Sequence, residues 1–209
     1  MLFRSYTKGL PQRLIGFHRF LENNPAWHGR VTFLQITPKS RSGVAEYEAL
    51  QREVDEVAGH INGTLGRLDW TPVRYVNRAF SHHVLAAIYR MAKIGLVTPL
   101  RDGMNLVAKE YVAAQDPEDP GVLVLSRFAG AAHELGGGAL LVNPYDVETI
   151  ADAIGRAVSM PLEQKRERYA AMAEAVRKND VFDWCNHYLD QLANLPATTV
   201  NHENEIPRG

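Results

Sequence analysis

Short apolar runs bounded by turn residues alternate with longer stretches of helical periodicity along most of the chain. The apolar runs predict buried strands at residues 31–37, 72–77, 94–99, 122–126 and 140–143. The periodic stretches predict helices at residues 12–22, 45–59, 83–93, 104–114, 147–159, 162–178 and 182–193. Strands and helices that alternate in this way form a parallel sheet with helices on both faces. We therefore predict an α/β fold, a Rossmann-like doubly wound domain with a parallel sheet of about five strands.

The polar turn after the third predicted strand is the first candidate for chemistry. It contains Asp102 and Gly103 and leads into the helix predicted at residues 104–114. Open α/β sheets bind ligands at such turns, because the first N–H groups of a helix have no partner within it and favour anions or hydroxyl oxygens. Gly103 has no Cβ, so a ligand can approach the backbone there. An ordinary connection in which Asp102 caps the helix is the alternative interpretation.

Composition narrows the class of protein. A chain of 209 residues suits one domain or two small ones, and 45% hydrophobic residues suffice for a substantial core. The formal net charge of −1 gives no basic surface for nucleic acid or membrane, and no apolar run has the length of a membrane span. Cys185 is the only cysteine, which excludes a disulfide and favours a reducing, cytoplasmic setting. We expect Cys185 to pack as a small buried hydrophobic residue.

The turn is part of a longer motif, VTPLRDGMNLVAKEYVA at residues 97–113, which resembles the donor-site segment of the trehalose-6-phosphate synthases. The resemblance covers residues 6–194. It continues in register at residues 8–11 (KGLP), 128–132 (FAGAA) and 142–145 (VNPY), and at Gln35, Arg41, Asn77 and Phe80. Members of this family are retaining glycosyltransferases of the GT-B type, which transfer glucose from UDP-glucose to glucose-6-phosphate.

This resemblance implies that the chain is one half of an enzyme. Family members have two Rossmann-like domains that face each other across a cleft, and residues 6–194 resemble the carboxyl-terminal, nucleotide-sugar-binding domain. The amino-terminal acceptor domain has no counterpart in this sequence. The expected substrates are UDP-glucose and glucose-6-phosphate, with no metal or other cofactor. Residues 195–209 show no periodicity and are expected to form a disordered tail.

For the donor sugar and diphosphate, the resemblance implies two catalytic residues, Lys8 and Asp102. Lys8 would contact the diphosphate of UDP beside the amino end of the following helix, and Asp102 would accept hydrogen bonds from the glucose hydroxyls. The backbone amides that follow Asp102 would complete this site, and they belong to Gly103, Met104, Asn105, Leu106 and Val107. We expect the side chains of the last two residues to lie in the core.

The resemblance also implies contacts with the nucleoside and the acceptor. Glu110 would bind the ribose hydroxyls, and Phe80 and Leu85 would border the uracil. Arg41 would reach the phosphate of the acceptor, for which a planar guanidinium is well suited. Ordinary roles remain the alternatives: solvent exposure for Glu110 and Arg41, and simple packing for Phe80.

Some positions depart from the family pattern or fit other chemistries poorly. Phe3 stands where family members have an arginine that contacts the diphosphate, and Arg4 is out of register by one position. We expect His82 and His83 to be solvated at a helix start, because no set of ligands at metal-binding spacing surrounds them. No second carboxylate pairs with Asp102, so a two-carboxylate glycosidase mechanism does not fit.

Two classes of function follow from the sequence. The first is a glycosyltransferase that is completed by the missing half and inactive without it. The second is a non-catalytic nucleotide-sugar-binding or regulatory domain. The sequence leaves a homo-oligomer open.

Overall fold

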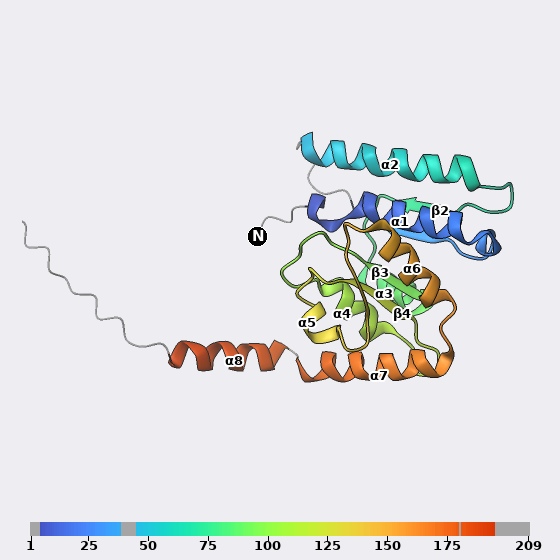
Figure 1. The fold of residues 1–209 in the computed structure, drawn as a ribbon. Helices are drawn as coiled ribbons and strands as arrows, with labels where there is room; N and C mark the ends of the chain where they lie inside the picture. Colours follow the sequence, from blue (N-terminus) through green and yellow to red (C-terminus); the bar gives the residue numbers. More distant parts are fainter. Residues whose placement is uncertain (1–4, 39–44, 180, 195–209) are drawn as a thin grey trace, which may run out of the picture. The chain divides into compact units, whose positions relative to one another are not determined.

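The computed structural model describes residues 5–38, 45–179 and 181–194 (Figure 1). Its strands are β1 (Phe33–Ile36), β2 (Val73–Val76), β3 (Ile94–Val97), β4 (Val122–Ser126) and β5 (Leu140–Val142). Its α-helices are α1 (Leu10–Asn23), α2 (Ala45–Leu65), α3 (His82–Met91), α4 (Leu106–Ala114), α5 (Ala132–Leu135), α6 (Val147–Val158), α7 (Leu162–Lys178) and α8 (Val181–Ala193). Short 3₁₀ helices, η1 (Ser5–Lys8) and η2 (Pro25–Trp27), flank α1.

The described strands pair in parallel, which confirms the predicted α/β fold. β1 pairs with β2, and β4 lies between β3 and β5. The hydrogen bonds among the described strands fall into two parallel sections, β1–β2 and β3–β4–β5. A side chain of α1 links the two sections: Arg13 donates hydrogen bonds to Gln35 of β1 and to Thr98, the residue after β3.

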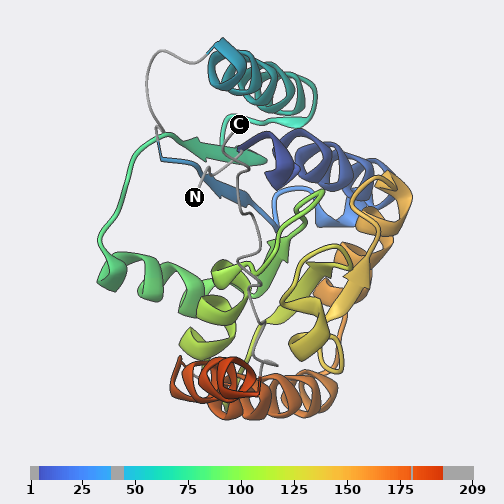
Figure 2. The same cartoon turned by 90° about the vertical axis from the view of Figure 1, so that its left-hand side faces the viewer.

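β4 is covered on both faces, as expected of a central parallel strand. All of its residues are buried. Val122 and Val124 pack in a cluster with residues of α1, α2 and α6, whereas Leu123 and Leu125 pack in a second cluster with residues of α4 and α7. Alternate side chains of a strand point to opposite faces, so the two clusters are the two sides of the sheet. Figure 2 shows the α1–α6 pair and the α3–α4 pair on opposite sides of these strands.

The seven predicted helices are all present, and α7 has the predicted bounds. α2 is longer than predicted: it continues through Gly59 and ends at Leu65, before Gly66 donates a backbone hydrogen bond to Asn62. α5 was not predicted, because its four residues are too short to show a periodicity. None of the described helices is long and apolar enough to cross a membrane.

The chain divides into two compact units, residues 1–176 and residues 177–209. In the second unit, the apolar side chains of Phe182 and Leu189 on α8 are exposed. Cys185 is exposed as well, so the expectation that it packs as a buried residue is wrong. The domain over residues 6–194 stays a prediction, and the tail at residues 195–209 lies outside the described residues.

Candidate functional site

The turn after β3 is held in place by the loop after β4. Asp102 N donates to the carbonyl oxygen of Phe128 (3.2 Å), and Gly130 N donates to the carbonyl oxygen of Asp102 (2.9 Å). Ala131 N donates to the carbonyl oxygen of Met104 (2.8 Å). These bonds use backbone groups of residues 102 and 104 on both sides of Gly103. The position of the Asp102 carboxylate is therefore set by two adjacent strand ends rather than by one loop.

Asn105, and not Asp102, caps α4. Asn105 has a left-handed backbone (φ 70°), and its side-chain oxygen accepts from Ala108 N at 3.1 Å. Its side-chain nitrogen donates to Asp102 Oδ2 at 3.0 Å. The interpretation of Asp102 as the helix cap is therefore wrong, because Asn105 takes that role and leaves the Asp102 carboxylate for other partners.

The first turn of α4 exposes apolar side chains. Leu106 is 57% exposed and Val107 is 45% exposed, so the expectation that they lie in the core is wrong. The buried face of α4 consists of Ala108, Tyr111 and Val112, which follow the i, i+3, i+4 spacing of one helix stripe. Leu106 and Val107 precede this stripe and fall on the other side of the helix.

Lys8 meets Asp102 across 94 positions of sequence. Its Nζ donates to Asp102 Oδ2 at 2.5 Å, and the lysine side chain is 34% exposed and the aspartate side chain 16%. Gly9, which follows, is the N-cap of α1 with φ 63°, a conformation that glycine adopts without the strain of a side chain. Leu100 N donates to the carbonyl oxygen of Thr7 at 2.7 Å and fixes the same two segments together. Two of the predicted site residues are thus in direct contact.

The predicted nucleoside residues lie on α3, α4 and the segment before α3. Glu110 is exposed on α4, and the hydroxyl of Tyr89 on α3 donates to its Oε2 at 3.5 Å. Burial first, and then the charge of Glu110, raises the pKa of Tyr89. Leu85 is partly buried on α3, and the guanidinium of Arg78 lies 4.7 Å from the centre of the Phe80 ring.

The remaining predictions have separate outcomes. Arg41 lies outside the described residues. His82 and His83 are exposed at the start of α3, as expected. No group of three His, Cys, Asp or Glu side chains among the described residues could hold a metal ion.

Two positions that support the site carried no separate signal in the sequence. Arg13 bonds to the backbone of Lys8, and Gly130 bonds to the backbone of Asp102. Gly130 lies in a segment that carries the family resemblance, but its spacing alone did not indicate contact with residue 102.

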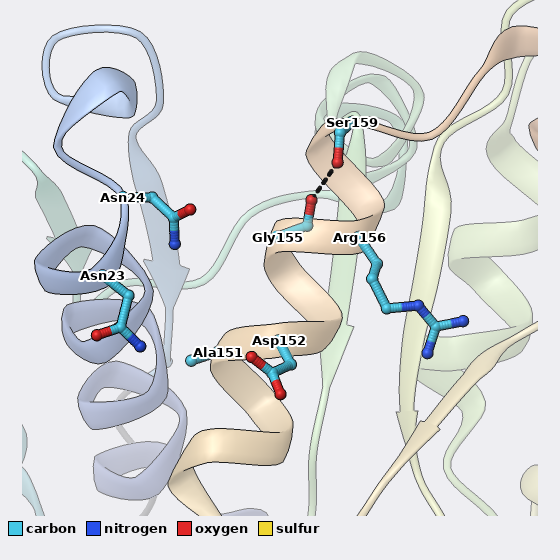
Figure 3. Close-up of a pocket in the computed structure, with 7 residues that line it drawn as sticks. All are labelled: Asn23, Asn24, Ala151, Asp152, Gly155, Arg156 and Ser159. Carbon is cyan, nitrogen blue, oxygen red and sulfur yellow. Dashed lines mark hydrogen bonds between the residues drawn. The ribbon is translucent and has the colours of Figure 1, made fainter.

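A hollow on the surface lies away from these residues. It has a volume of about 330 Å³ and is lined by Asn23, Asn24, Ala151, Asp152, Gly155, Arg156 and Ser159 (Figure 3). It lies between the carboxyl end of α1 and α6, whereas Lys8 precedes the amino end of α1. A helix of 14 residues is about 20 Å long at a rise of about 1.5 Å per residue. The hollow contains none of the predicted site residues.

Comparison with known proteins places this geometry in a family. The family model for glycosyltransferase family 20 matches residues 4–194. The trehalose-6-phosphate synthase of Sinorhizobium fredii is 63% identical over 187 residues, which cover 90% of this chain and 40% of the relative. The chain thus spans about two fifths of the length of the curated relatives it matches.

Solved structures agree with the sequence comparison. An α,α-trehalose-phosphate synthase (UDP-forming) from Burkholderia xenovorans, in complex with glucose-6-phosphate, has a TM-score of 0.88 and 49% identity, with 90% of this chain and 41% of that chain covered. A protein from E. coli bound with UDP-2-fluoro glucose has a TM-score of 0.88 and 48% identity, with 91% and 42% covered.

Proposed function

Because the chain belongs to glycosyltransferase family 20, we propose that it is the donor-binding, carboxyl-terminal half of a UDP-forming trehalose-6-phosphate synthase. The observation that carries this proposal is the contact of Lys8 with Asp102 at the carboxyl ends of the β3–β4–β5 section. A cation for a diphosphate and a carboxylate for sugar hydroxyls lie together there, beside the amino ends of α1 and α4. UDP-glucose is the proposed donor and glucose-6-phosphate the proposed acceptor.

In this structure Lys8 and Asp102 form an ion pair with each other. A diphosphate attracts the lysine more strongly than one carboxylate does, because it carries more negative charge. As Lys8 turns to the diphosphate, Asp102 becomes available to the hydroxyls of glucose, and Asn105 keeps the carboxylate oriented through its side-chain amide. The amides of residues 103–107 serve the remaining oxygens of the sugar and phosphate. Binding is thus an exchange of partners within a prepared turn.

The nucleoside is proposed to lie along α3 and α4. Glu110 accepts hydrogen bonds from the ribose hydroxyls, in place of its weak contact with Tyr89. Phe80 and Leu85 provide apolar surface beside the uracil. Arg41, outside the described residues, is proposed to reach the acceptor phosphate.

We propose a retaining transfer in which the leaving diphosphate takes the proton of the acceptor hydroxyl on the same face of the sugar. The contribution of this chain is to orient the donor and to stabilise the charge that develops on the diphosphate. Lys8 and the amides after Asp102 supply that stabilisation, and no step requires a metal. The amino-terminal half contributes most of the acceptor site.

A chain that spans two fifths of its relatives fits a second function when it acts alone, that of a nucleotide-sugar-binding domain without transferase activity. We propose that the isolated chain binds UDP and UDP-glucose weakly, because one wall of the cleft is absent. We further infer that it works in the cytoplasm, where nucleotide sugars are available and Cys185 stays reduced.

Titration calorimetry of the chain with UDP and UDP-glucose tests the donor assignment. Both ligands should bind. Lys8→Met should lower the affinity for UDP by roughly ten- to a hundredfold, which is the effect of losing one charge-assisted hydrogen bond. Lys93→Met is the matched control, since Lys93 forms an exposed ion pair with Asp119. Equal affinity of the Lys8→Met variant and the unmodified chain for UDP would contradict the assignment.

Glu110→Ala should lower the affinity for UDP by about tenfold, because it removes the carboxylate that accepts hydrogen bonds from the ribose hydroxyls. The same titration with 2′-deoxy-UDP separates this contact from a general effect on the fold. The unmodified chain should bind 2′-deoxy-UDP more weakly than UDP, whereas the Glu110→Ala variant should bind both about equally. If the Glu110→Ala variant still prefers UDP to 2′-deoxy-UDP as strongly as the unmodified chain does, Glu110 does not bind the ribose.

A further inference from the structure

Arg13 lies beneath the turn that presents Lys8. It is partly buried in the first turn of α1. Its Nη2 donates to the carbonyl oxygen of Lys8 (3.0 Å), its Nε to Thr98 Oγ1 (3.2 Å) and its Nη1 to Gln35 Oε1 (3.4 Å). Thr98 and Gln35 are themselves buried. One guanidinium thus joins the Lys8–Gly9 turn to the carboxyl ends of β1 and β3.

The three acceptors of Arg13 are neutral. None of the ion pairs formed by the described residues includes Arg13. Arg19, on the same helix, differs in this respect, since it is exposed and pairs with Glu22 and Glu148. Burial lowers the pKa of Arg13 to about 10, so the group is still protonated at neutral pH. Two of the five N–H groups of this guanidinium have no partner among the described residues.

A positive charge that is partly removed from water and has no carboxylate partner is unfavourable unless an anion compensates it. The nearest place for an anion is the amino end of α1, where Lys8 and the first N–H groups of the helix already favour negative charge. Placing the cation there costs folding free energy and raises the electrostatic potential of the subsite at the same time.

We propose that Arg13 is a positioning residue of the diphosphate subsite, which holds the Lys8–Gly9 turn in place and supplies an uncompensated positive charge for the diphosphate. This inference rests on the proposed binding of UDP. It assigns to Arg13 no contact with the reacting atoms. The charge acts through Lys8 and through the potential at the helix end.

The test compares UDP with UMP, which carries one phosphate fewer, by titration calorimetry on the full chain. Arg13→Gln keeps a hydrogen-bond donor and removes the charge, whereas Arg13→Lys keeps the charge. Arg19→Gln is the matched control, because it removes the same charge from the exposed side of α1. The midpoint of thermal unfolding is recorded for every variant without ligand, so that losses of binding and of folding are separated.

Arg13→Gln should lower the affinity for UDP by roughly tenfold and the affinity for UMP by less than about threefold. The reason is that the second phosphate of UDP carries the added negative charge that Arg13 attracts. Arg13→Lys should stay within about threefold of the unmodified chain for UDP, and Arg19→Gln should change neither affinity. Equal losses for UDP and UMP, or an Arg13→Lys variant as weak as Arg13→Gln, would make Arg13 a structural residue and overturn the inference. If the unmodified chain does not bind UDP, the proposed function fails and the inference with it. Normal UDP binding by Arg13→Gln overturns the inference alone.

Discussion

Replacing Asp102 by alanine should lower the glucose-6-phosphate-dependent release of UDP by about a hundred- to ten-thousandfold, in an enzyme assembled from this chain and the complementary part of the Sinorhizobium fredii relative. The estimate corresponds to two hydrogen bonds to a charged group, each contributing about 1.5–3 kcal/mol. Asp102 is mostly buried, fixed by the loop after β4 and oriented by Asn105. No other carboxylate is held at this turn among the described residues.

The same variant should keep its affinity for UDP. Without Asp102 the diphosphate no longer competes with a carboxylate for Lys8, so UDP should bind as well as before or more tightly. Asp116→Ala is the control, since Asp116 forms an exposed pair with Arg90. UDP release by Asp102→Ala within tenfold of the unmodified assembly would show that the carboxylate does not act on the donor sugar.

Replacing Gly130 by alanine should disrupt the same turn from the neighbouring strand end. A Cβ at this position would lie 2.0 Å from the carbonyl oxygen of Gly103 and 2.7 Å from its carbonyl carbon. Backbone atoms cannot move aside as a flexible side chain does, so the two loops must separate and the bonds that hold residues 102 and 104 are strained. We expect a loss of about 2–4 kcal/mol in the free energy of unfolding.

The matched control is Gly137→Ala, because a Cβ at Gly137 meets no atom within 4 Å. Urea unfolding should show a change of less than about 0.5 kcal/mol for this control. Titration with UDP-glucose should show at least about tenfold weaker binding for Gly130→Ala and no change for Gly137→Ala. Equal stability of the two variants would mean that the loop after β4 does not support the Asp102 turn.

The elements of this fold could be predicted from the sequence because their signals are local. β4 is a continuous apolar run between turn residues. α7 has an acidic residue, Glu163, in its first turn and two basic residues, Arg177 and Lys178, in its last turn, as the helix dipole favours. The bounds of both elements agree with the prediction. The division of the sheet into two sections had no local signal. It depends on how β1 and β3 lie relative to each other, and a side chain from α1 connects them there.

The candidate site was predictable in its residues but less so in its contacts. Asp102 and Asn105 are both good helix caps, and the sequence near them cannot decide between the two. Which of the two caps the helix depends on Lys8, which lies 94 positions away in the sequence and forms an ion pair with the Asp102 carboxylate. The exposure of Leu106 and Val107 follows from where the buried stripe of α4 begins, which composition does not reveal. The role proposed for Arg13 likewise needs its three acceptors to be known, because an arginine in a helix is ordinarily a surface residue.

The most direct measurement is UDP release from UDP-glucose with and without glucose-6-phosphate. It compares this chain alone, the complementary part of the Sinorhizobium fredii relative alone, and the two mixed. We expect no glucose-6-phosphate-dependent release from either part and clear release from the mixture, because the transition state needs the groups of both walls in place at once. Robust turnover by this chain alone would contradict the claim that it is the donor-binding half of a two-domain enzyme.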